Sequence, residues 1–285
     1  NFVNANLYNV RTGFITGTPQ QLPTFYSFIG GFIIGPSTDL SGADLSGGNL
    51  SGVSIENADL TNANFYNVSS GGIQGVPRKP LNEPYVVTTN GYIVGPNVNL
   101  NNATMTNIDL RGLTLTNALM LNVNFANTKT GNNIGVPRQL TPPYIHVQTT
   151  LSGGFIVGPS VDISYGNFSY ADISTADLTN AKLSNAIFFQ TRSGQMATGI
   201  PASLPSGYSI LSTTVSGGYL VGPNVNLNDA NFSGSNTILT GSNITNATME
   251  RVNFDGAKMG GGELVGPPST INPLYRYIQS SVSGG

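Results

Sequence analysis

The sequence contains no cysteine, no tryptophan and a single histidine, and only 8% of its 285 residues are charged. Without cysteine it can form neither disulfides nor thiolate metal sites, and one histidine is too few for the usual zinc and copper ligand sets. Thirteen acidic and eleven basic residues give a net charge of −2, without the clustered Lys and Arg of a nucleic-acid-binding surface. No apolar run reaches the roughly 18 residues of a membrane-spanning helix. We therefore expect no nucleic-acid partner and no membrane insertion.

What the sequence does contain is a large apolar residue at every fifth position. A smaller residue, such as Ala43 or Ala58, lies two positions before most of them, and Asn, Asp, Ser, Thr and Gly fill the rest. A period of five fits neither the 3.6 of a helix nor the 2 of a strand. The backbone is therefore expected to turn a corner every five residues, with the large and small apolar side chains inward. The runs lie near residues 38–67, 98–127, 161–190 and 225–259.

These positions predict the core. The residues expected to be buried include Leu45, Leu60, Leu110, Leu178 and Phe254, together with Ala58, Ala176 and Ala247. Asn and Ser are expected to be exposed. In the last run the spacing slips by two between Phe232 and Leu239, which predicts a local bulge at a corner through Ser235, Asn236 and Thr237.

The repeating unit, as in Ala43-Asp44-Leu45-Ser46-Gly47 and Ala176-Asp177-Leu178-Thr179-Asn180, resembles that of the pentapeptide-repeat family. The resemblance implies an all-β fold, a right-handed quadrilateral parallel β-helix, with four pentapeptides and hence about twenty residues in each coil. Such a solenoid is stabilised by contacts between neighbouring coils rather than by any one coil.

A second repeated motif interrupts the runs. It begins with Gly-Thr-Pro, Gly-Val-Pro or Gly-Ile-Pro at residues 17–19, 75–77, 135–137 and 199–201, and it ends in an apolar stretch and a Gly-Pro pair. The glycines of these pairs, Gly35, Gly95, Gly158 and Gly222, lie 60, 63 and 64 residues apart. Because sixty residues would make three coils of twenty, we interpret each interruption as an irregular coil that keeps the phase of the solenoid. This predicts a single continuous solenoid over residues 1–285, with about four and a half super-repeats, as part of a longer array.

No catalytic, cofactor-binding or metal-binding site is predicted. The one histidine, His146, is expected to be an outward-facing strand residue, with no nucleophile or second base assigned to it. Stacked carboxylates could bind Ca²⁺, but a short polar side chain at these positions also bonds to nearby backbone at a corner. The aspartates concerned are Asp39, Asp44, Asp59, Asp162, Asp172 and Asp177. Seven Asn-x-Ser/Thr sequons arise from the repeat itself, at Asn49, Asn67, Asn102, Asn167, Asn231, Asn243 and Asn246.

Three functions remain open. A structural or assembly protein, forming a rod, fibre or shell component at a virion or extracellular surface, fits the low charge and the lack of catalytic groups. A ligand-facing surface for ice or a polysaccharide is the alternative. The family resemblance adds a third, because some pentapeptide-repeat proteins mimic DNA and bind type II topoisomerases, but such a mimic needs a strongly acidic surface.

The ends of the sequence suggest which partners to expect. The sequence opens within a run, with Phe2 and Leu7 at inward spacing, and residues 275–285 reproduce residues 208–218 up to the point where an apolar strand would follow. Neither end carries a polar cap, which a solenoid needs to cover its terminal coil. The expected partners are therefore further coils of the same chain, other copies of it, or assembly proteins.

Overall fold

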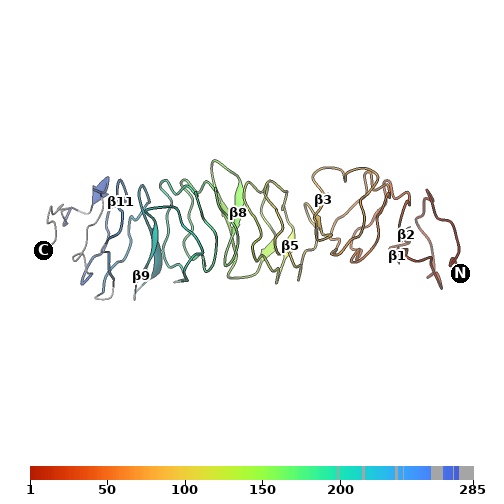
Figure 1. Ribbon diagram of the computed structural model, residues 1–285, viewed down its shortest axis with the longest axis horizontal. Coiled ribbons are helices and arrows are strands. Elements are labelled where there is room, and N and C mark those ends of the chain that lie inside the picture. Colours follow the sequence, from red (N-terminus) through yellow and green to blue (C-terminus); the bar gives the residue numbers. More distant parts are fainter. Residues whose placement is uncertain are drawn as a thin grey trace. The chain divides into compact units, whose positions relative to one another are not determined.

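A computed structural model describes residues 1–197, 199–213, 216–234, 237–239, 241–257, 266–271 and 273–275. The described residues form short strands, bridges and turns, and no helix that could cross a membrane is found among them. The chain divides into two compact units. Unit 1 comprises residues 1–124 and 133–141, and unit 2 comprises residues 125–132 and 142–285. Within each unit the ribbon traces successive loops around a core, and arrows mark only the short strands (Figure 1).

Unit 1 contains two antiparallel hairpins and one parallel pair. Its strands are β1 (Ser27–Ile29), β2 (Phe32–Ile34), β3 (Val86–Val87), β4 (Ile93–Val94), β5 (Leu119–Met120) and β6 (Gln139–Leu140). The hairpins are β1–β2 and β3–β4, and the parallel pair is β5–β6.

Unit 2 repeats this arrangement. Its strands are β7 (Ile145–Gln148), β8 (Gly154–Val157), β9 (Ser209–Thr213), β10 (Gly217–Val221), β11 (Thr248–Met249) and β12 (Thr270–Ile271). The hairpins are β7–β8 and β9–β10, and the parallel pair is β11–β12. The sequence predicted strands in the interruptions but not that they would pair as antiparallel hairpins.

The pentapeptide runs form coils with four sides. Parallel bridges join residues twenty positions apart on each of the four sides: Asp39 with Asp59, Asp44 with Asn64, Asn49 with Ser69, and Ser54 with Gln74. Four sides of five residues therefore close one coil, and each coil stacks in parallel on the next. Parallel connections of this kind are right-handed in nearly all proteins. The fold is a right-handed quadrilateral β-helix.

The core consists of the residues predicted from the five-residue spacing. Leu45, Leu60, Leu110, Leu178 and Phe254 are all buried, as are Ala58, Ala176 and Ala247. Phe2, expected to point inward, is 41% exposed, whereas Leu7 is buried. Ser70 and Ser193, expected to be exposed, are buried, and so is Thr130. They have a specific role in the interruptions, described below.

The corners explain why Asn and Gly follow the large apolar residue. The carbonyl of Leu40 accepts a hydrogen bond from the N–H of Ala43 at 3.0 Å, and the residue between them at the second turn position, Gly42, has φ of +68°. This is the hydrogen bond of a β-turn, whose left-handed position favours Gly or Asn. Asn57 and Asn62 occupy the equivalent position with φ of 55° and 59°. The polar residues of the repeat are therefore required by backbone conformation.

Each interruption enlarges one coil. Within unit 1 the bridge from Ser69 leads to Asn99, thirty residues on, and within unit 2 the bridge from Arg192 leads to Asn226. The chain first stays in register, since Arg78 N–H donates to the carbonyl of Ala58, twenty residues back. The hairpin then adds residues before the next run begins, and that run stacks on the coil of Ser69 through the pairing of Ser69 with Asn99.

The interpretation of sixty residues as three coils is therefore wrong. Asp39 stacks on Asp59. Asn99, which is equivalent to Asp39 in the next super-repeat, does not stack on Asp59 or its column but on Ser69, ten residues and two sides of the coil after Asp59. One super-repeat of unit 1 thus makes about two and a half coils, and the hairpin takes up the remaining residues. Residue spacing could not reveal this, because a hairpin and half a coil can contain the same number of residues.

A hydroxyl, buried in three of the four hairpins and half-buried in the first, bonds to the second strand of each hairpin. The hydroxyl oxygen of Ser70 accepts a hydrogen bond from the N–H of Ile93 at 2.9 Å, and Ser193 does the same for Leu220 at 2.9 Å. Thr12 and Thr130 lie at the equivalent positions of the other two hairpins, where they bond to the backbone of β2 and β8. A buried backbone group without a partner is costly, so these hydroxyls are needed inside the core.

A tyrosine covers the glycine that ends each interruption. A Cβ atom added to Gly95 would lie 2.3 Å from Cδ1 of Tyr85, so that only glycine fits beneath the ring. The Tyr85 hydroxyl donates to the carbonyl of Pro96 at 3.3 Å, and the ring packs against Phe65 with centroids 5.1 Å apart. The same contact recurs between Tyr26 and Gly35, Tyr144 and Gly158, and Tyr208 and Gly222.

The slip in the last run falls partly on residues outside the description, because Ser235 and Asn236 are not described. The coil around them is longer than the others: Asn226 pairs with Thr248, and Asn231 with Asn253, twenty-two residues apart in both cases. Leu239 is buried. The two extra residues are therefore absorbed within one coil, as predicted, and the inward register resumes after it. Met259, the last position of this run, also lies outside the described residues.

Candidate interaction surfaces

The aspartates of the repeat serve the corners. The carboxylate of Asp44 accepts a hydrogen bond from the N–H of Ser46 at 3.2 Å, and that of Asp177 accepts one from Thr179 at 2.9 Å. Each side chain therefore satisfies a backbone N–H at the start of a turn, which is the role that short polar residues play at such positions.

Of the stacked carboxylates, Asp59 lies in a cluster of ion pairs. Only Asp39 and Asp59 stack on each other, and the Asp59 carboxylate lies 2.5 Å from Arg78 and 3.8 Å from Lys79. The hydroxyl of Thr61 and the guanidinium of Arg78 hold the pKa of Asp59 far below its ordinary value. Asp44, Asp162 and Asp172 stack on Asn64, Lys182 and Arg192. Among the described residues no three His, Asp or Glu side chains gather as a metal site would require.

His146 is placed differently from the prediction. It lies in β7 opposite Ile156, and its side chain is half-buried instead of facing outward. Burial lowers the pKa of His146, and its Nε2 atom is buried without a hydrogen-bond partner among the described residues.

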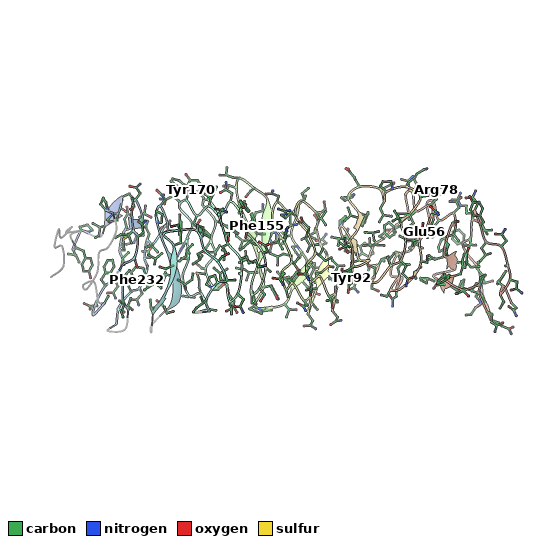
Figure 2. The ribbon with its side chains drawn as sticks, in the orientation of Figure 1. Glu56, Arg78, Tyr92, Phe155, Tyr170 and Phe232 are labelled. Carbon is green, nitrogen blue, oxygen red and sulfur yellow. The ribbon has the colours of Figure 1, made fainter. Side chains whose placement is uncertain are left out.

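An exposed aromatic cluster on unit 2 is the feature that sequence reasoning missed. Tyr165 and Tyr170 are 74% and 60% exposed, and on the next coil Ile187 and Phe189 are 50% and 42% exposed. The rings of Tyr170 and Phe189 meet edge to face, with centroids 5.4 Å apart. In Figure 2 Tyr170 lies at the outer edge of the coils, whereas Phe155 lies inside. We call these four residues the aromatic face.

The two tyrosines of the aromatic face occupy strained positions. Tyr165 has φ of 62° and Tyr170 has φ of 59°, the left-handed corner positions that Asn or Gly fills in most other pentapeptides. Left-handed backbone costs a residue other than glycine or asparagine about 1 kcal/mol. Neither ring recovers this cost by burial. The signal was present in the sequence, as a tyrosine where the repeat has Asn or Gly, but only the observed φ values show its cost.

The hairpin β7–β8 extends the aromatic face. The hydroxyl of Ser152, at the turn of this hairpin, donates to the carbonyl of Asn167 at 2.8 Å. Asn167 lies between the two tyrosines in sequence and pairs with Ile187. Leu151, next to Ser152, is 65% exposed. Apolar surface therefore continues from the coils toward the hairpin turn.

The sequence matches the family model for pentapeptide repeats in eight copies, over residues 38–69, 160–192 and 224–266. The second run, residues 98–127, lies outside these segments but has the same coil geometry: Thr104 pairs with Asn124, twenty residues on. No curated protein matches the sequence.

HetL and QnrB1 are two of the solved structures that are similar to this chain. HetL is described as a pentapeptide repeat protein involved in heterocyst differentiation regulation, from the cyanobacterium Nostoc sp. strain PCC 7120. It is 16% identical, with 78% of this chain and 77% of HetL covered and a TM-score of 0.19. QnrB1 is described as a plasmid-mediated fluoroquinolone resistance protein. It is 12% identical, with 80% of this chain and 78% of QnrB1 covered and a TM-score of 0.16. Scores this low carry no argument. The assignment depends on the family match and on the observed coils, which identify pentapeptide repeats over the matched residues 38–69, 160–192 and 224–266.

Proposed function

We propose that this chain is a non-catalytic scaffold that assembles with further copies of itself through the aromatic face, as an element of a fibre or shell. The observation that carries the proposal is the placement of Tyr165 and Tyr170 at left-handed corners, where they are exposed. Residues kept in strained conformations without a structural gain point to a function. Aromatic residues are enriched in protein interfaces, where they bury a large area.

The surroundings of the aromatic face favour a second copy as its partner. The chain has a net charge of only −2, so two copies repel each other weakly. Some acidic residues are also paired with cations, as in the contacts of Asp59 with Arg78 and of Asp229 with Arg251. A weakly charged chain is better suited to bind a copy of itself than a strongly charged partner.

The test replaces both tyrosines by asparagine, the residue that the repeat prefers at these corners. The variant Tyr165→Asn/Tyr170→Asn should be at least as stable as the parent, because asparagine tolerates the left-handed conformation better. It should also lose association, measured by multi-angle light scattering across a range of concentrations. Loss of association with unchanged stability separates a contact role from a structural one.

Tyr8→Asn is the matched control, because Tyr8 is 70% exposed but lies in unit 1. It should leave association unchanged. The proposal fails if the parent chain stays at the 29.7 kDa mass of a monomer at all concentrations, or if the double variant associates as the parent does.

A further inference from the structure

A hollow on unit 1 joins residues from four successive coils. It has a volume of about 270 Å³ and is lined by Tyr66, Asn67, Asn97, Asn117, Leu119 and Arg138. The coils are stacked in this order by backbone hydrogen bonds, from Asn67 N–H to Asn97 carbonyl and then onward to the coil of Arg138. At about 4.8 Å per coil the hollow extends over about 14 Å.

The lining combines three kinds of group. Tyr66 presents a ring that is 53% exposed. The three asparagines supply carboxamides, which both donate and accept hydrogen bonds, and Nδ2 of Asn117 donates to Oδ1 of Asn97 at 3.3 Å. Arg138 supplies a positive charge.

The side chain of Arg138 differs in its contacts from the equivalent arginine of the first super-repeat. Among the described residues its guanidinium forms no ion pair and no side-chain hydrogen bond. The equivalent arginine sixty residues earlier, Arg78, bonds to the carboxylate of Asp59 at 2.5 Å. The residue equivalent to Asp59 in the hollow is Leu119. The arginine is thus present in both super-repeats, but its carboxylate is missing from the second.

The first super-repeat therefore has a closed copy of the same surface. Asn57 and Ser37 lie sixty residues before Asn117 and Asn97, and the pair Tyr8-Asn9 takes the place of Tyr66-Asn67. In this copy Arg78 also reaches toward Oδ1 of Asn9, at 3.4 Å. The Asp59 carboxylate shows where an anionic group can bind to such an arginine.

We propose that the hollow is a binding site for an acidic sugar, whose carboxylate binds Arg138 in the place that Asp59 has beside Arg78. The sugar hydroxyls match the carboxamides of Asn67, Asn97 and Asn117, because both kinds of group donate and accept. The apolar face of the sugar ring packs on Tyr66. A simple acidic side chain would use the arginine but not the amides, and a nucleic acid would need several cations, whereas the lining contains one.

The proposal is independent of the aromatic face, which lies on unit 2. It is tested by isothermal titration of the full chain with three probes: a galacturonic acid trimer, the corresponding neutral galactose trimer, and N-acetylglutamate amide. The acidic trimer should bind at least about tenfold more tightly than the other two, since hydrogen bonds to charged groups contribute about that much. Equal binding of N-acetylglutamate amide would show a general anion site and overturn the assignment to a sugar.

Two variants and a control locate the site. Arg138→Gln should weaken binding of the acidic trimer about tenfold or more. Leu119→Asp should have the same effect without loss of stability, because it recreates the pairing of Arg78 with Asp59 and places Asp after Ala118, as the repeat does after its small apolar residue. Arg78→Gln, in the closed copy, should leave binding unchanged. Absence of binding by the parent chain, or undiminished binding by Arg138→Gln or Leu119→Asp, would refute the proposal.

Discussion

Replacing Gly158 by alanine should destabilise unit 2 by about 3 kcal/mol, the upper range for overpacking a filled site. The new Cβ atom would lie 2.2 Å from Cδ1 and 2.9 Å from Cε1 of Tyr144, whereas carbon atoms in contact are about 3.5–4.0 Å apart. The ring would have to move by more than about 1 Å to restore that distance. It cannot do so freely, because Phe125 packs against its other side with ring centroids 4.9 Å apart. Gly158 itself is not in the left-handed region, so the cost is steric.

A double-mutant cycle isolates this steric effect. Tyr144→Ala alone should cost about 2–3 kcal/mol through lost ring packing. Adding Gly158→Ala to it should cost almost nothing further, because the atom it would strike is gone. The two substitutions should therefore be coupled by about 3 kcal/mol, measured from urea unfolding followed by circular dichroism.

Gly52→Ala is the control for glycine removal as such. Gly52 has φ of 70° and nothing within 4 Å of an added Cβ, so its replacement should cost about 1 kcal/mol through backbone strain alone. If Gly158→Ala costs no more than Gly52→Ala, or if the cycle is additive within about 0.5 kcal/mol, the close packing of tyrosine on glycine does not stabilise the interruption.

Three further substitutions test the core, the hairpins and the ion pair. Leu178→Asp should destabilise the chain by several kcal/mol, because it leaves a charge without a partner in the core; a variant that melts like the parent would disprove the assigned register. Ser193→Ala should cost about 1–3 kcal/mol by leaving the N–H of Leu220 unpaired, and faster hydrogen exchange at that amide should accompany it. The pKa of Asp59 is lowered on folding. The contribution of Asp59 to the free energy of unfolding is therefore present above about pH 4 and is lost as the pH falls below that value. Arg78→Met should weaken this dependence, and an unchanged difference in urea midpoint between about pH 6 and pH 3 would contradict it.

The candidate surfaces were predictable only in part. The sequence predicted no ordinary catalytic or metal site. Of the two interpretations of the aspartates, Ca²⁺ binding and hydrogen bonding to the backbone at a corner, the structure shows the second. Tyr165 and Tyr170 stand where the repeat has Asn or Gly, but that signal was missed, and only the φ values show what the placement costs. The hollow was beyond sequence reasoning, because Tyr66 and Arg138 lie seventy-two residues apart and meet only through the stacking of coils.

The sequence by itself determined the five-residue register and the identity of the core, because a corner every five residues is a local property of the backbone. Turn chemistry and side-chain size act within one pentapeptide and can be read along the chain. Only the tertiary structure decided how many coils one super-repeat makes. The step from Ser69 to Asn99, the hairpins, and the seating of Tyr85 on Gly95 all depend on which segments pair across thirty residues or pack across ten. Pairing over such distances is set by the packing of whole coils, which spacing along the sequence does not record.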